Sequence, residues 1–256
     1  MESNQPESID TPIKRLPGQA LREERDNLLD EHVYDPLTIA FAGCVCFVFE
    51  CLHVFSPVKP SLWIGGLFAV PTIAYAAYKC IVVRRKLRAY RRGEEGERIV
   101  AKAIEDNLIP RGYKVIHDIQ LTKDGKRFNI DHLVIGGNGV FAVETKNYTK
   151  PRKGCAKVTY DGKQPYWNGM PHNKNEADQA ESAANDAKEL IARKTGMSVD
   201  VRPVLCCVGW WAASSDLYGH PVLLVMEKTI GNVIPKVLTR RCLTEEEQKV
   251  IYSALI

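Results

Sequence analysis

Residues 130–146 read IDHLVIGGNGVFAVETK, and they carry the strongest signal of strand pairing in the chain. Two apolar segments flank the turn sequence GGNG, in which Asn138-Gly139 is a strong signal for a two-residue hairpin, because a type I′ turn requires positive φ at both central positions. A hairpin closed there places Asp131 opposite Lys146. Glu144 then projects from the same face, because side chains on a strand alternate with a period of two. The stretch therefore predicts a hairpin that presents two carboxylates and one ammonium group together.

Ionisable side chains on apolar strands have two interpretations. Two acids can hold a hard cation and a lysine can orient or deprotonate an attacking water, so the three residues form a candidate one-metal hydrolytic site. The alternative is a buried ion pair or triad that fixes the strand register. Buried salt bridges seldom give a net gain in stability, because desolvation offsets the Coulomb attraction. The general association of clustered ionisable groups with active sites favours the first interpretation.

Residues 93–194 resemble the NERD (nuclease-related) domain, a branch of the PD-(D/E)xK nuclease superfamily. The resemblance rests on an ordered set of motifs: GEEGE at 93–97, IDHLV at 130–134, GVFAVETKNY at 139–148, and Asn175 with Gln179 at the start of a predicted helix. The Glu-x-Lys pair alone would be a weak signal, whereas the ordered set at these spacings is a strong one. Ile130 stands where the superfamily has a proline before the aspartate, which fits the NERD variant.

The resemblance implies an α/β fold with an αβββαβ restriction-endonuclease-like core around a mixed sheet. It also implies a metal site for Mg²⁺ or Mn²⁺. The implied ligands are the carboxylates of Asp131 and Glu144, assisted by the carbonyl of Thr145.

The same resemblance implies roles for three further side chains. Lys146 would position the nucleophilic water or neutralise charge on the phosphate. Glu97, on the first helix of the domain, would face the same cleft, and Gln179, on the helix after the hairpin, would contact metal-bound water or substrate. The implied substrate is nucleic acid, either DNA or RNA.

Two apolar segments precede this region: residues 37–55 read LTIAFAGCVCFVFECLHVF, and residues 62–83 read LWIGGLFAVPTIAYAAYKCIVV. Each approaches or exceeds the roughly 20 residues that a helix needs to cross a bilayer. The short connection at 56–61 predicts an antiparallel helical hairpin. Basic residues lie mainly outside the hairpin, notably Arg84, Arg85, Lys86, Arg88, Arg91 and Arg92. By the positive-inside rule, both termini and the following domain are predicted to be cytoplasmic. The alternative is a buried helical hairpin in a soluble fold.

The predicted organisation has four parts: a flexible cytoplasmic tail at 1–35 with a short helix near 19–29, two transmembrane helices at 36–83, a basic juxtamembrane linker at 84–92, and a NERD-type domain at 93–256. The net charge of +4 does not by itself indicate nucleic-acid binding. The eight cysteines show no paired CxxC spacing. They therefore resemble neither a zinc site nor a secreted disulfide framework.

Within the domain, apolar periodicity predicts an alternation of helices and strands. The expected helices are 94–108, 175–194 and a terminal helix that begins with a capping box of Thr244 and Glu247. The expected strands are 113–120, 128–135, 140–147, 202–208 and 221–226, with a small extra hairpin at 156–167. His132 is expected on the opposite sheet face from Asp131, as a core histidine and not as a metal ligand.

Three functional hypotheses follow. The first is a membrane-anchored, metal-dependent nuclease. The second is a catalytically weak or inactive NERD module that binds nucleic acid or a protein partner at the membrane. In the third, the helical hairpin is the working part and the domain is a sensor or scaffold. The sequence contains no P-loop, no Gly-x-Ser-x-Gly motif and no dinucleotide fingerprint, so it gives no support for nucleotide hydrolysis or serine chemistry.

Overall fold

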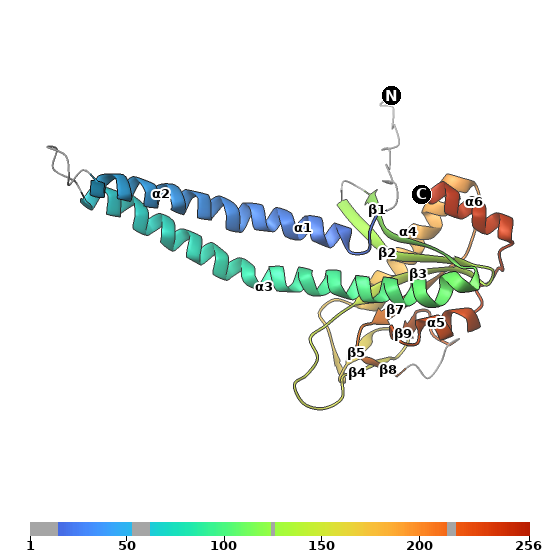
Figure 1. Cartoon of the computed structure of the whole chain (residues 1–256). Helices are drawn as coiled ribbons and strands as arrows, with labels where there is room; N and C mark the ends of the chain where they lie inside the picture. Colours follow the sequence, from blue (N-terminus) through green and yellow to red (C-terminus); the bar gives the residue numbers. More distant parts are fainter. Residues whose placement is uncertain (1–14, 53–61, 124–125, 214–218) are drawn as a thin grey trace, which may run out of the picture. The chain divides into compact units, whose positions relative to one another are not determined.

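A computed structural model describes residues 15–52, 62–123, 126–213 and 219–256 (Figure 1). The chain divides into two compact units. One unit is Leu21–Arg91, and the other combines Arg92–Ile256 with the N-terminal residues up to Ala20. The second unit contains all of the predicted site residues.

The first unit is helical. Helix α1 (Gln19–Leu29) continues through a π-helical turn (Asp30–Tyr34) into α2 (Asp35–Leu52), and α3 spans Leu62–Leu108. Helices α2 and α3 pack closely at Gly43, where a Cβ would lie 2.6 Å from the Thr72 hydroxyl, and they run in opposite directions (Figure 1). The helical hairpin is therefore confirmed; its predicted connection at 56–61 lies outside the described residues.

The short helix near 19–29 is confirmed, and residues 30–34 of the predicted tail are helical as well. The predicted basic juxtamembrane linker, residues 84–92, lies inside the continuous helix α3. Arginine, lysine, leucine and alanine, which dominate this stretch, are strong helix formers.

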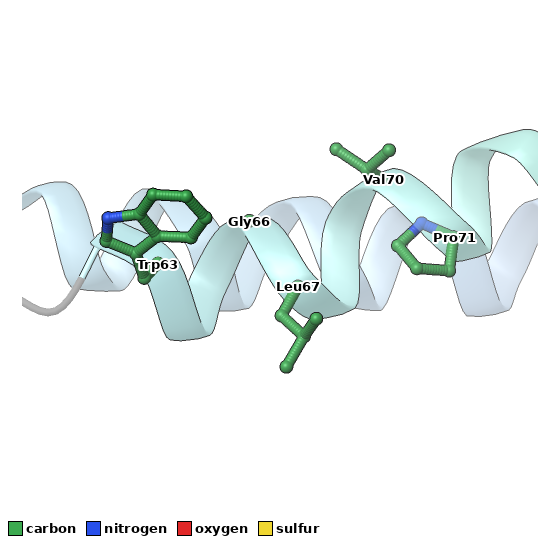
Figure 2. Close-up of a pocket in the computed structure, with 5 residues that line it drawn as sticks. All are labelled: Trp63, Gly66, Leu67, Val70 and Pro71. Carbon is green, nitrogen blue, oxygen red and sulfur yellow. The ribbon is translucent and has the colours of Figure 1, made fainter.

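Both helical segments, Gln19–Leu52 and Gly66–Arg111, are long and apolar enough to cross a membrane by length and composition. Many of the apolar side chains in these segments are not covered by the rest of the described chain: Trp63 is 91% exposed and Leu67 is 71% exposed. Figure 2 shows these two residues with Gly66, Val70 and Pro71 around an open apolar pocket of about 480 Å³ on α3. Exposed apolar surface of this kind is one that a membrane or a protein partner could cover.

The second unit is built on a mixed five-stranded sheet of order β1-β2-β3-β7-β9. Its strands are β1 (Lys114–Lys123), β2 (Lys126–Gly136), β3 (Gly139–Lys146), β7 (Val201–Cys207) and β9 (Leu223–Val225). The first three pair antiparallel, and β3, β7 and β9 pair parallel. With the end of α3 before β1 and α4 before β7, this order confirms the predicted αβββαβ core.

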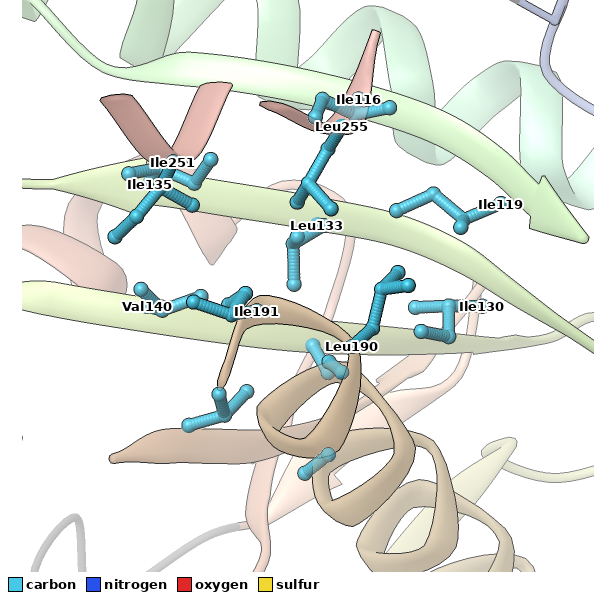
Figure 3. Close-up of a cluster of buried hydrophobic side chains, with 14 of the residues drawn as sticks. Ile116, Ile119, Ile130, Leu133, Ile135, Val140, Leu190, Ile191, Ile251 and Leu255 are labelled. Atoms are coloured by element: carbon cyan, nitrogen blue, oxygen red, sulfur yellow. The ribbon is translucent and has the colours of Figure 1, made fainter. Parts of the chain in front are cut away.

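Helices cover both faces of this sheet. On one face, α4 (Glu176–Thr195) and α6 (Glu245–Leu255) pack against β1, β2 and β3, with Leu190 and Ile251 fully buried (Figure 3). On the other face, Val100 and Ile104 of α3 pack against β2, β3 and β7. Fully burying each such side chain contributes about 1.5–3 kcal/mol. Cover on both faces explains why β2 and β3 read as nearly continuous apolar runs.

The predicted helix ends are confirmed. The Asn175 side chain accepts a hydrogen bond from the Ala177 N–H and begins α4, and Gly196 ends it in the left-handed conformation. Thr244 and Glu247 form the capping box of α6. Short helical turns precede α6: 3₁₀ helices at Ile109–Arg111 and Ile234–Lys236, and α5 at Ile230–Val233.

The predicted extra hairpin is confirmed and belongs to a second sheet. That sheet has the order β6-β5-β4-β8, with strands β4 (Lys157–Tyr160), β5 (Pro165–Trp167), β6 (Met170–Pro171) and β8 (Trp211–Ala213). Strand β8 pairs parallel to β4. Only three residues long, it offers too short an alternation to be recognised in the sequence.

The turn of the central hairpin differs from the prediction. Gly136 pairs with Gly139, so Gly137 and Asn138 are the central residues of the turn. Positive φ occurs at neither of them but at Gly139, with φ 133°. Tertiary hydrogen bonds override the local preference, because the Asn138 side-chain amide donates to the carbonyls of Ile234 and Val237.

Gly139→Ala should therefore destabilise the protein by about 2–4 kcal/mol, since it combines an unfavourable φ with a steric clash. A Cβ there would lie 2.1 Å from the Thr239 hydroxyl. The matched control is Gly137→Ala, whose Cβ would meet only Gln248 Nε2 at 3.6 Å and the Leu243 carbonyl at 3.9 Å. Denaturant unfolding of the two variants measures the difference, and equal stabilities would contradict this account of the turn.

Candidate active site

The candidate site lies where strands β2 and β3 separate. Their regular ladder ends at the His132–Val143 pair. At the next position Asp131 and Glu144 stand opposite each other, and the Asp131 carboxylate accepts the Thr145 backbone N–H at 2.8 Å. Beyond this point β2 pairs with β1 and β3 pairs with β7. The Asp131 side chain thus takes the place of a backbone carbonyl as the partner of the Thr145 N–H, and β2 and β3 separate between the two acids.

The predicted register of β2 against β3 is wrong by two residues, but the predicted site residues do come together. Asp131 lies opposite Glu144 and not opposite Lys146, because the turn closes one residue earlier than predicted. Lys146 lies on the same strand as Glu144, and its Nζ is 2.6 Å from Glu144 Oε1. Asp131 acts electrostatically on Lys146 as well. The three ionisable groups therefore form one cluster.

Glu97 of α3 joins this cluster, as expected. Its side chain is buried, and its Oε2 has no hydrogen-bond partner among the described residues. Burial, with the negative charges of Asp118 and Glu144, raises the pKa of Glu97 to about 8, against the smaller effects of the Gly18 N–H and Lys146. Without added positive charge, Glu97 is therefore protonated at neutral pH.

Asp131 shows the same excess of negative charge. Burial raises its pKa well above the usual range, and Glu144 and Glu97 raise it further. The positive charge of Lys146 and the hydrogen bond from the Thr145 N–H oppose this shift only in part. Glu97, Asp131 and Glu144 share one lysine, so without a cation the site favours protonation of its buried acids.

Lys146 remains an ammonium ion in this environment. Burial by itself lowers the pKa of Lys146, but the charges of Glu144 and Asp131, the hydrogen bond to Glu144 and the charge of Glu176 outweigh burial, so the pKa is raised. A lysine with a raised pKa is a poor general base at neutral pH. Of the two roles considered from the sequence, orienting water or phosphate is favoured over deprotonating water.

Asp118 of β1 was not singled out from the sequence. It is fully buried, has φ 51°, and lies opposite Asp131 between two regular pairs of the β1–β2 ladder. The Asn129 amide donates to both Asp118 and Asp131, at 3.3 Å each. The only sequence signal was an acid inside an apolar strand, IHDI at 116–119.

Helix α4 brings a different acid close to the site. Glu176, in its first turn, is 1% exposed, accepts hydrogen bonds from Tyr148 Oη at 2.8 Å and His172 Nδ1 at 2.7 Å, and acts on Lys146. Gln179, one turn later, is half-buried. The described contacts do not join its side chain to the cluster, so its predicted role stays a prediction.

His132 is a core histidine, as expected. It is fully buried, its Nδ1 lies 2.8 Å from His117 Nδ1, and its Nε2 lies 3.3 Å from the Thr145 hydroxyl. Burial, followed by the charge of His117, lowers the pKa of His132 well below its usual value. A neutral imidazole with partners on both nitrogens supports β2 and β3 from the face opposite the acids.

The donor set suits magnesium better than a metal that needs a complete protein cage. Within the described residues, no group of three or more His, Cys, Asp or Glu is placed to hold a metal ion. Mg²⁺, however, is usually bound by one or two carboxylates, with waters and substrate phosphates completing its octahedron. Asp131 and Glu144 can supply two such ligands. The raised pKa values of Asp131 and Glu97 reflect burial first and then nearby negative charge, which a cation would offset. All eight cysteines are free, and Cys206 and Cys207 are buried in the core.

Comparison with known proteins agrees with this geometry. Residues 92–208 match the model of the family described as nuclease-related domain, NERD. The chain is also similar to an uncharacterized protein of Bacillus anthracis, with 43% identity over 58 residues, which is 22% of this chain and 27% of that protein. The chain thus covers about a quarter of that relative's length. No solved structure matches significantly.

Proposed function

Because residues 92–208 carry a nuclease-related domain, we propose that this protein is a membrane-anchored nuclease that uses Mg²⁺ or Mn²⁺ to hydrolyse phosphodiester bonds of DNA or RNA. The observation that carries the proposal is the opening between β2 and β3, where Asp131, Glu144 and Lys146 gather inside the matched segment. At this opening the Thr145 N–H is bound by the Asp131 carboxylate and not by a backbone carbonyl of β2. An ion pair that served only to fix the strand register would not require the loss of that backbone hydrogen bond.

The residues have complementary roles in this proposal. Asp131 and Glu144, with the Thr145 carbonyl, would hold the cation, which lowers the pKa of a bound water and polarises the phosphate. Lys146 stays charged and is held against Glu144, so it orients the attacking water or offsets charge on the phosphate. Glu97 adds a further acid from α3. Gln179 is assigned to metal-bound water or substrate by the family resemblance alone.

Two features of the chain support membrane anchoring. Most side chains in the apolar parts of α2 and α3 are not covered by the rest of the described chain, and the basic residues at 84–92 continue α3 directly beyond the apolar segment. Charges of this kind near a bilayer contribute about 1 kcal/mol each through anionic lipid. We therefore place both termini and the nuclease-related domain on the cytoplasmic side.

A cleavage assay with the full chain in detergent or nanodiscs tests the function. Labelled DNA and RNA, single- and double-stranded, should be cut with Mg²⁺ or Mn²⁺ and left intact in excess chelator. Binding of nucleic acid without cleavage at any cation concentration would instead support the second hypothesis, a module that keeps the fold without turnover. The full chain is the appropriate sample, because a fragment from Gly93 onward would lack the N-terminal residues that contact Glu97 and Asp118.

A further inference from the structure

Residues 15–20 lie against the acidic cluster although they precede the nuclease-related domain by more than 70 positions. Arg15 Nε donates to Asp118 Oδ2 at 2.7 Å, and the Ala20 N–H donates to the same oxygen at 3.0 Å. The Gly18 N–H forms a hydrogen bond with the Glu97 carboxylate. Three separate donors of one short segment therefore engage two acids of the site.

This segment fits closely against Asp118 and Glu97. The Arg15 side chain is only 9% exposed, and that of Asp118 is 0% exposed. Gly18 has φ 73°, and a Cβ there would lie 3.1–3.3 Å from Glu94, so the approach favours glycine. Glu97 and Asp131 are 4% and 6% exposed. Of the cluster, only Lys146 and Glu144 keep side chains more than a tenth exposed, at 18% and 13%.

The charges indicate what would uncover them. Arg15 supplies positive charge to a cluster of four acids, Glu97, Asp118, Asp131 and Glu144, that otherwise contains Lys146. The Asn129 amide connects Asp118 to Asp131. The Arg15 guanidinium therefore binds the acid that lies next to the proposed cation ligand Asp131. A divalent cation at Asp131 and Glu144 would repel the nearby guanidinium in a partly desolvated environment, where charges act more strongly than in water.

The Arg15–Asp118 pair is suited to opening. A buried ion pair loses much of its Coulomb attraction to desolvation, so its net contribution to stability is small. Within the described residues the segment pairs with no strand of either sheet, and its last two residues begin helix α1. Its release therefore need not disturb the core of the domain.

We propose that residues 15–20 form a latch that closes the acidic site while Arg15 binds Asp118, and that divalent-cation binding at Asp131 and Glu144 releases it. The latch rests on the proposed function for its substrate, whereas its opening requires only cation binding. It makes access to the site depend on a segment outside the family-matched domain.

The first test uses the unmodified full chain and Mn²⁺. Hydrogen–deuterium exchange at the Ala20 amide, which is held by Asp118, should become faster when Mn²⁺ is added, and Asp131→Asn should abolish that acceleration. Unchanged or slower exchange at Ala20 would overturn the latch. Cleavage without faster exchange at Ala20 would contradict the latch but not the proposed function. Faster exchange at Ala20 without cleavage would contradict the proposed function but not the latch.

The second test weakens the latch. Arg15→Gln should bind Mn²⁺ at least about fivefold more tightly by calorimetry or electron paramagnetic resonance, the lower end of the usual range for coupled sites. Arg240→Gln is the matched control, because its side chain is 91% exposed and lies 4.0 Å from Asp200. Equal or weaker Mn²⁺ binding by Arg15→Gln would contradict the proposal. If this variant does not fold, the Ala20 exchange of the unmodified chain decides alone.

Discussion

Asp131→Asn is expected to reduce Mg²⁺-dependent cleavage on the order of 10³-fold, comparable to the loss of a principal electrostatic group from an active site. The change removes one of two proposed cation ligands and leaves a side chain that can still accept the Thr145 N–H. Binding of Mn²⁺ should weaken in parallel, because the effect acts through the cation. Initial rates on labelled DNA or RNA, together with Mn²⁺ titrations, measure both quantities.

The controls for this prediction are exposed residues of α3. Asp106 and Lys102 form a salt bridge whose side chains are 58% and 78% exposed, so Asp106→Asn and Lys102→Ala should retain the original rate. Lys146→Ala should lose activity while still binding Mn²⁺, because Lys146 acts on water or phosphate and not as a ligand. If cleavage survives both Asp131→Asn and Lys146→Ala, the proposed mechanism is wrong.

Local sequence signals predicted the elements of this protein well. Strand alternation, the Asn175 cap, the Gly196 stop and the Thr244–Glu247 capping box all lie within a few residues of their effect, and the structure confirms each. The sequence also predicted that Asp131, Glu144 and Lys146 come together. A register error of one residue would have placed the two acids on different faces of the sheet, but the actual error is two residues and keeps them on the same face.

The features that the sequence did not reveal depend on distant contacts. The hairpin closes one residue early because Asn138 is held by carbonyls about a hundred residues away. Asp118 joins the site across the β1–β2 ladder, and its ion-pair partner Arg15 is 103 residues earlier in the chain. Glu176 follows the Asn175 cap, so its place in the first turn of α4 was predictable. Its burial was not, because the local sequence around it is the same as that of a solvated acid at the start of a helix.

Glu97→Gln should make the cation-free protein more stable at high pH, by a few kcal/mol. Between the usual glutamate pKa near 4.5 and the native value of about 8, the folded chain holds a proton on Glu97 that the unfolded chain has lost. The folded state therefore binds more protons in this window, and the free energy of unfolding falls as pH rises through it. Each unit of difference corresponds to about 1.4 kcal/mol, so roughly 2–4 kcal/mol should be lost between pH 5 and pH 8.5.

Glutamine at position 97 removes this titration while keeping an acceptor for the Gly18 N–H. Urea unfolding in excess chelator at a series of pH values should show a flatter profile for Glu97→Gln than for the unmodified chain, whereas Glu95→Gln, an exposed acid two residues earlier on α3, should change little. Adding Mn²⁺ should restore stability to the unmodified chain at pH 8.5, since a ligand that binds the folded state stabilises it. Identical pH profiles for Glu97→Gln and the unmodified chain would contradict this prediction. Glu97 would then carry its charge in the folded protein at no cost in stability, and there would be no excess of negative charge for the cation to offset.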